Sequence, residues 1–97
     1  MEDLSNIKPV TAETVSDRQR LFRTVTPRSE VKIGRYVKIP FEEMDGERTL
    51  REHMWVEITQ DANGEFIGRL DNDPLILTNV KFNDIVTVDF DQIEQML

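Results

Sequence analysis

The sequence predicts an α+β domain. One N-terminal helix packs on a twisted antiparallel sheet of about four strands, and this sheet can curl into a small, partly open barrel. Apolar residues recur at helical spacing in residues 11–25 and alternate with polar residues in segments 31–41, 53–70 and 84–90. Gly, Asn and Pro separate these segments. The length of 97 residues allows one domain, residues 11–97, after a loose N-terminal leader, residues 1–10.

The predicted helix has an amphipathic pattern. Its inner stripe consists of Ala12, Val15, Phe22 and Val25, with Gln19 filling the gap. The helix begins at Thr11 or at Ser16, which has Gln19 in capping-box spacing, and Pro27 ends it.

The clearest strand signal is a hairpin around Asn63-Gly64 that carries the only tryptophan, Trp55. A two-residue turn would place the apolar Ile58 opposite Arg69. A three-residue loop, 62–64, instead sets Ile58 opposite Gly68 and Val56 opposite Leu70, so that the apolar faces agree. The pattern therefore predicts the longer loop, with Gly64 left-handed as a G1 bulge.

The other segments follow from alternation and turn residues. Odd positions from Val31 to Phe41 face the core, with a bulge at Gly34-Arg35, and Val86, Val88 and Phe90 face inward near the end. Residues 41–50 read as an acidic loop with a glycine turn. Asp73-Pro74 breaks the hairpin strand, leaving Leu75–Leu77 as core or interface. A final helical turn, 91–96, has Asp91 as its N-cap.

The charge is strongly asymmetric. The chain carries a net charge of −7, with eight basic and five acidic side chains in residues 1–40 but four and fourteen in residues 41–97. The acidic part should repel nucleic acid and anionic membranes, so neither is predicted as a partner. The absence of cysteine excludes a disulfide framework, and no segment reads as a signal peptide or a membrane span. We expect a cytoplasmic protein.

Motifs with chemistry are few. Asp71-Asn72-Asp73 resembles the start of a calcium loop, but Ile76 and Phe82 occupy the positions of its glycine and its bidentate glutamate. His53 is the only histidine, so a zinc site would need carboxylates alone beside it. No phosphate-binding glycine loop and no nucleophile motif is present. The sequence predicts no catalysis, no cofactor and no metal site.

Several short motifs occur together in one order. They are the run from Glu52 to Ile58, the Gly-x-Leu of Gly68-Arg69-Leu70, Asn72-Asp73-Pro74, and the Lys81-x-x-Asp84-x-Val86 near the end. Over residues 31–97 the chain resembles the bacterial domain-of-unknown-function family 2314, and the resemblance implies a fold more than a function. The chain has Asn83 where that family usually has glycine, and its end at Leu97 lacks the family's terminal Asp-Trp.

These observations predict a small, acidic, non-catalytic protein-binding module with a protein partner that can be basic. The alternative is an inhibitor or immunity protein whose acidic surface occludes a basic nucleic-acid-binding enzyme; its carboxylates would lie on one face, whereas those of a general module would be dispersed. The candidate interaction residues are Glu42, Glu43, Asp45, Glu47, Trp55, Ile67, Asp71, Asp73, Leu75 and Leu77. An enzyme would instead need a deep pocket holding two of His53, Asp71, Asp73 and Tyr36.

Overall fold

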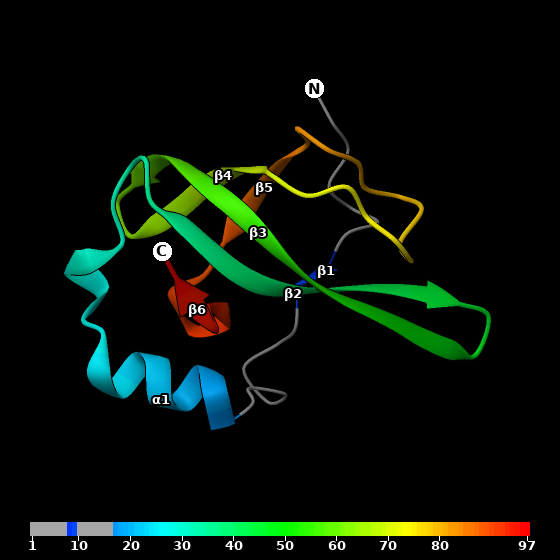
Figure 1. Ribbon diagram of the computed structural model, residues 1–97, viewed down its shortest axis with the longest axis horizontal. Helices are drawn as coiled ribbons and strands as arrows, with labels where there is room; N and C mark the ends of the chain where they lie inside the picture. Colours follow the sequence, from blue (N-terminus) through cyan, green and yellow to red (C-terminus); the bar gives the residue numbers. More distant parts are fainter. Residues whose placement is uncertain (1–7, 10–16) are drawn as a thin grey trace.

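One helix and an antiparallel sheet make up the described part of the chain (Figure 1). The structure is a computed structural model that describes residues 8–9 and 17–97. In chain order the elements are β1 (Lys8–Pro9), α1 (Asp17–Val25), the 3₁₀ turn η3 (Arg28–Glu30), β2 (Tyr36–Asp45), β3 (Arg48–Ala62), β4 (Glu65–Leu70), β5 (Ile85–Val88), the 3₁₀ turn η4 (Phe90–Gln92) and β6 (Gln95–Met96). This composition fits the predicted α+β class.

The sheet has more strands than predicted. Five follow one another in the order β1-β2-β3-β4-β5, all neighbours are antiparallel, and β6 pairs with β2 in addition. Within the described residues no pairing joins β5 to β1 or β6, so the sheet is not closed. The prediction of about four strands missed β1 and β6 because each has two residues, too few for an alternating pattern. β1 belongs to the predicted leader, whose other residues lie outside the described part.

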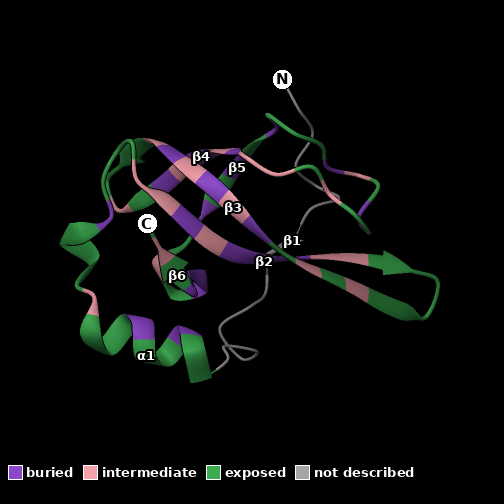
Figure 2. Ribbon diagram, viewed as in Figure 1, coloured by how far each residue is buried: buried purple, intermediate pink, exposed green. Residues whose placement is uncertain are grey.

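The core lies against one face of the sheet, because the long strands bury alternate side chains (Figure 2). The buried apolar residues of the described part are Phe22, Val31, Val37, Ile39, Phe41, Met54, Val56, Ile58, Phe66, Leu70, Leu77, Val80, Val86, Val88 and Ile93. Strand residues therefore supply most of the core. It is completed by Phe22 of α1, Val31 after η3, Ile93 after η4, and Leu77 and Val80 of the segment between β4 and β5.

α1 packs through two side chains on its inner stripe, Gln19 and Phe22. The Gln19 amide donates a hydrogen bond to the main-chain carbonyl of Gln92 at 2.7 Å. The Phe22 and Phe90 rings lie 5.3 Å apart between centroids. The helix is thus fastened to η4 by one buried hydrogen bond and one aromatic contact, and Gln19 fills the stripe as predicted.

Two residues predicted to face the core are instead 65% exposed, Val25 and Ile33. Val25 is the last residue of α1, where the chain leaves the helix. Gly34 follows Ile33 with a φ of +93° and turns the chain, so β2 begins at Tyr36 and not at position 31. The predicted helix starts, Thr11 and Ser16, and the stripe residues Ala12 and Val15 lie outside the described residues.

The hairpin between β3 and β4 has the predicted pairing of core residues, but its turn differs from the predicted one. Ile58 faces Gly68 and Val56 faces Leu70, as predicted. The turn, however, is the two-residue Asn63-Gly64 loop, whose residues have φ values of 55° and 94°, as a type I′ turn requires. Thr59 forms a bulge in β3 that shifts the register by one residue. The predicted three-residue loop is wrong, whereas Gly64 is left-handed as predicted.

We expect Gly64→Val to lower the free energy of unfolding by about 1–3 kcal/mol, because a β-branched residue is strained at positive φ. Gly64→Asn is the matched control, since asparagine adopts this conformation more readily, and it should cost less. Urea denaturation followed by tryptophan fluorescence measures both. Equal losses would mean that the cost comes from Arg28, whose Nη2 lies 2.8 Å from an added Cβ, and not from the backbone.

The predicted acidic loop is a two-stranded arm. β2 and β3 stay paired until Asp45 faces Arg48, and Gly46-Glu47 forms the turn between them. Figure 1 shows this arm, residues 42–51, projecting from the rest of the sheet. Opposite charges support the pairing, with Arg51 2.8 Å from Glu42 and Arg48 3.3 Å from Asp45. The loop prediction failed because the charge run was read without its cross-strand partners.

The C-terminal segment also departs from prediction in one respect. Asn83 has a φ of 76° at the turn before β5, and Val86 and Val88 are buried as expected. The predicted helical turn with Asp91 as N-cap is wrong, because the chain forms η4, capped reciprocally by Asp89 and Gln92, and then β6.

Candidate functional site

The segment between β4 and β5 forms a long loop without secondary structure of its own, and residues 71–80 of it are called the anchored loop below (yellow to orange in Figure 1). Its first residues continue along β3. The N–H of Asp71 donates to the Trp55 carbonyl at 2.9 Å, and the N–H of Trp55 donates to Oδ1 of Asn72. The Asn72 side chain therefore replaces the next main-chain acceptor as the chain leaves the sheet.

The middle of the anchored loop is held by Glu52 of β3. Its carboxylate accepts hydrogen bonds from three consecutive main-chain N–H groups, those of Leu75 at 2.7 Å, Ile76 at 2.9 Å and Leu77 at 3.2 Å. Glu52 pairs with Phe41 across the strands and shares its face, the one that carries the core. One ionised side chain thus satisfies a stretch of backbone that no strand pairs with.

Glu43 of β2 holds the following residues in the same way. Its carboxylate accepts from the N–H groups of Thr78 and Asn79, both at 3.0 Å, and from the Thr78 hydroxyl at 3.1 Å. Glu43 pairs with Leu50, two residues along β3 from Glu52, so the two carboxylates lie on one face of the arm. Together they satisfy five consecutive N–H groups, residues 75–79.

The hydrogen bonds favour the ionised form of both carboxyl groups. Burial opposes ionisation of Glu52, but the three N–H donors of residues 75–77 outweigh it and lower its pKa below the ordinary value. The pKa of Glu43 is lowered mainly by the N–H of Thr78, with help from Asn79 and the Thr78 hydroxyl. Both groups are therefore charged at neutral pH, and both contacts are charge-assisted.

The anchored loop presents apolar side chains to solvent. Leu75 is 92% exposed and Ile76 is 50% exposed, although their N–H groups are bound by Glu52. Leu77 and Val80 turn the other way and are buried in the core. The sequence left open whether residues 75–77 belong to the core or to an interface. Leu77 belongs to the core and is no longer a candidate interaction residue, whereas Leu75 is exposed and remains one.

Most of the other predicted acidic residues have partners. Glu42 and Asp45 pair with arginines of the arm, and Asp71 lies 3.2 Å from Arg69. Only Glu47 and Asp73 among the predicted acidic residues have no hydrogen bond or ion pair to the described part of the chain. The carboxylates are therefore spread over the arm, the sheet and the loop, and do not form one face.

Trp55 and Ile67 lie on the face of the sheet opposite the core, and both are half-buried. The Lys38 ammonium lies 5.9 Å from the centre of the Trp55 ring. On the same face Arg69 is bound by Glu57 at 2.9 Å. A main-chain hydrogen bond links Trp55 to Asp71, the first residue of the anchored loop. Ile67 lies in β4 and is not part of that loop.

His53 has a partner that the sequence did not suggest. Its Nδ1 lies 2.6 Å from a carboxylate oxygen of Glu94, whose side chain is 4% exposed, while the imidazole is 44% exposed. The contact thus joins a buried carboxylate to a half-exposed imidazole. No group of three or more metal-ligating side chains is placed to hold an ion in the part of the chain that the structure describes.

Sequence reasoning missed Glu52, the residue that organises the site. Its position in the strand could have identified it. Met54, Val56 and Ile58 alternate inward along β3, and Glu52 continues the same parity. A charged residue on the core side of a strand needs a partner, so this position was a candidate for a buried or capping interaction.

The described residues form an α+β fold with a surface loop whose backbone is held by two carboxylates. The chain belongs to a family described as "Uncharacterized protein conserved in bacteria (DUF2314)", whose model matches residues 10–97. The resemblance drawn from the motifs is thereby confirmed. Neither the curated proteins nor the solved structures contain a match to this chain. Among the described residues, no helix has the length and apolar character needed to cross a membrane.

Proposed function

We propose that this protein is a non-catalytic protein-binding module of the cytoplasm and that the anchored loop is its contact surface. The observation that carries the proposal is the pair of side chains, Leu75 and Ile76, exposed on a backbone that Glu52 holds in place. An isolated exposed leucine is ordinary. Here two charged groups are used to fix the segment that displays it.

Fixing the backbone matters for binding. A flexible loop loses conformational freedom when it meets a partner, and that loss weakens the complex. The Glu43 and Glu52 hydrogen bonds order residues 75–79 before any partner arrives. Burying one leucine side chain contributes about 1.5–3 kcal/mol, so two exposed apolar residues on an ordered loop can anchor a small interface.

The inhibitor or immunity reading is the second candidate, and the excess of acidic residues after position 40 supports it. Against it stands the pairing of these charges, since Glu42, Asp45 and Asp71 face arginines and Glu43 binds the loop. By the criterion of one face against dispersal, the arrangement favours a general module. A basic partner would meet only Glu47 and Asp73 as unpaired candidates.

Capture experiments with a double variant test the proposal. Tagged wild-type protein and Leu75→Ser/Ile76→Ser are incubated with lysate of the native host, and captured proteins are quantified by mass spectrometry. We expect at least one protein to be enriched about tenfold or more by the wild type and to be lost with the variant, because the apolar anchors carry the contact. That protein, purified, must then bind directly.

The matched control is Leu21→Ser/Val25→Ser on α1, where both residues are similarly exposed, at 62% and 65%. It removes the same kind of surface at another place and should keep the partner. A second arm uses Glu47→Lys/Asp73→Lys, which tests the inhibitor reading without disturbing the loop contacts. If the loop variant captures the same proteins as wild type, the loop is not the contact surface. If only the charge variant loses the partner, the inhibitor reading replaces the proposal.

A further inference from the structure

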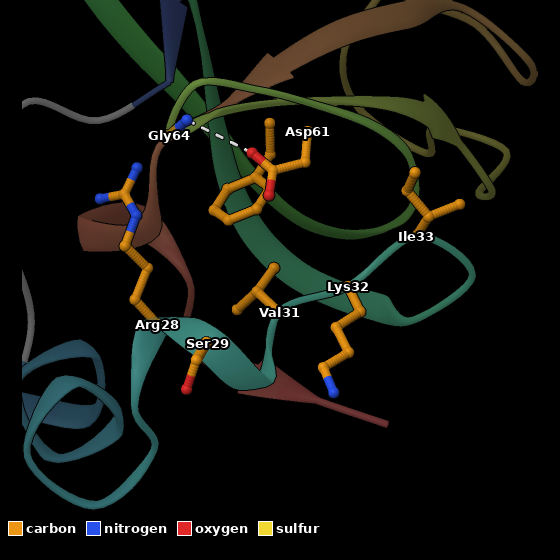
Figure 3. Close-up of a pocket in the computed structure, with 8 residues that line it drawn as sticks. Arg28, Ser29, Val31, Lys32, Ile33, Asp61 and Gly64 are labelled. Carbon is orange, nitrogen blue, oxygen red and sulfur yellow. Dashed lines mark hydrogen bonds between the residues drawn. The ribbon is translucent and has the colours of Figure 1, made fainter.

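A groove lies away from the anchored loop, between η3 and the β3–β4 turn (Figure 3). Its volume is about 780 Å³, within the size range of sites for small organic ligands. Its lining residues are Arg28, Ser29, Val31, Lys32, Ile33, Asp61, Gly64 and Phe66. The groove is thus built by two segments that are more than 25 residues apart in the chain.

The floor and one wall of the groove are apolar. Phe66 and Val31 belong to the core and are 2% and 3% exposed, so they form a fixed floor. Ile33, which precedes the turn at Gly34, is 65% exposed and lines the groove. A ligand with an apolar body would bury apolar surface of Ile33, which favours binding.

Arg28 supplies the charge. Its guanidinium carbon lies 5.4 Å from the centre of the Phe66 ring, and its Nη2 lies so close to Gly64 that an added Cβ would be 2.8 Å away. The guanidinium thus lies between an aromatic ring and the Gly64 turn. A planar donor group of this kind suits two-point recognition of a carboxylate.

No described carboxylate neutralises this arginine. Arg28 and Lys32 form no ion pair within the described part, whereas Arg20, Arg23, Arg48, Arg51 and Arg69 each have at least one. Asp61, the acidic residue of the groove, accepts a hydrogen bond from the Gly64 N–H at 3.3 Å, which Figure 3 draws as a dashed line. The groove thus offers a cation without a counterion in a chain of net charge −7.

We propose that this groove binds a small organic acid, a carboxylate attached to an apolar or aromatic body. The carboxylate accepts hydrogen bonds from the Arg28 guanidinium, and the apolar body extends along the groove toward Val31 and Ile33. This site is separate from the protein-binding surface, so either can fail without the other.

The test uses phenylacetate as the probe and phenylacetamide, its neutral counterpart, as the comparison. Amide chemical shifts of the isotope-labelled full chain are followed during titration with each compound. We expect saturable phenylacetate shifts confined to residues 28–34 and 61–66, with a dissociation constant of about 1–10 mM for so small a ligand. Phenylacetamide should bind at least about fivefold more weakly, because it cannot pair with Arg28.

Variants locate the interaction. Arg28→Gln should reduce phenylacetate binding to the level of phenylacetamide, whereas Arg18→Gln, which removes an equal charge from α1, should not change it. Ile33→Ser should weaken both compounds, since it removes the apolar wall. The fold of each variant is checked from its unshifted amides. Equal binding of the two compounds, shifts that do not saturate, or unchanged binding by Arg28→Gln would each overturn the proposal.

Discussion

Gly68→Ala should lower the free energy of unfolding by about 3 kcal/mol, although it adds only one methyl group. Gly68 lies in β4 opposite Ile58 of β3 and Val86 of β5, so strands flank it on both sides. An added Cβ would lie 2.7 Å from the main-chain oxygen of Glu57 and would also overlap the Val56 side chain. The backbone oxygen cannot move without breaking the strand pairing, and overpacking of this kind typically costs 1–3 kcal/mol or somewhat more.

Gly46→Ala is the control for this variant. Gly46 lies at the tip of the arm with a φ of +64° and no atom within 4 Å of an added Cβ, so only backbone strain of about 1 kcal/mol is expected there. Urea denaturation of both variants, with the slope of the transition compared with wild type, gives the difference. A loss at Gly68 no larger than at Gly46 would show that β3 and β4 can separate enough to admit the methyl group.

The same contact gives a physical reason for the Gly-x-Leu motif on which the family resemblance partly rested. Gly68 supplies the space for Val56, and Leu70 fills the core opposite that residue. Alternation along the strands was enough to predict β3, β4, β5 and their inner faces, because a buried face forces a period of two. The strands that could not be predicted, β1 and β6, are stabilised by pairing with β2 and carry no pattern of their own.

The errors share one cause, which is that the pattern was read segment by segment. The two-residue turn was rejected because it misaligned Ile58, but a bulge at Thr59 corrects the alignment within the strand. The acidic arm looked like a loop because Glu42 and Asp45 were counted without Arg51 and Arg48 opposite them. Bulges and cross-strand pairs depend on the partner strand, and one segment alone does not contain that information.

The site shows the same division. Leu75 was predicted as a candidate contact and is exposed, while Leu77 is buried. Alternation would place these two residues on the same side, because they are two positions apart, so the pattern could not separate them. The roles of Glu43 and Glu52 could not be read from composition, where they count only as two acidic residues among nineteen. Their function depends on which N–H groups the chain brings back to them from residues 75–79.

The double variant Glu43→Ala/Glu52→Ala should release the anchored loop while leaving the sheet folded. Hydrogen bonds to a charged acceptor contribute about 1.5–3 kcal/mol, and the variant removes the acceptor of five N–H groups. Hydrogen-exchange protection of residues 75–79 should therefore fall about 100-fold, with protection of β3 and β4 nearly unchanged. Glu42→Ala, which removes a neighbouring carboxylate that pairs with Arg51, is the control and should not affect the loop.

Acid should produce the same release in the wild-type protein. The pKa values of Glu43 and Glu52 are lowered in the folded state, below the ordinary value of 4.5. Their stabilising contribution is therefore complete above pH 4.5 and is lost as the pH falls through the lowered values.

Protection factors, which correct for the intrinsic pH dependence of exchange, should decrease for residues 75–79 below pH 4.5 in wild type. In Glu43→Gln/Glu52→Gln, which keeps neutral acceptors, they should be lower at neutral pH and insensitive to acid. A wild-type loop that stays protected after both groups are protonated would show that the carboxylates accompany the loop conformation and do not hold it.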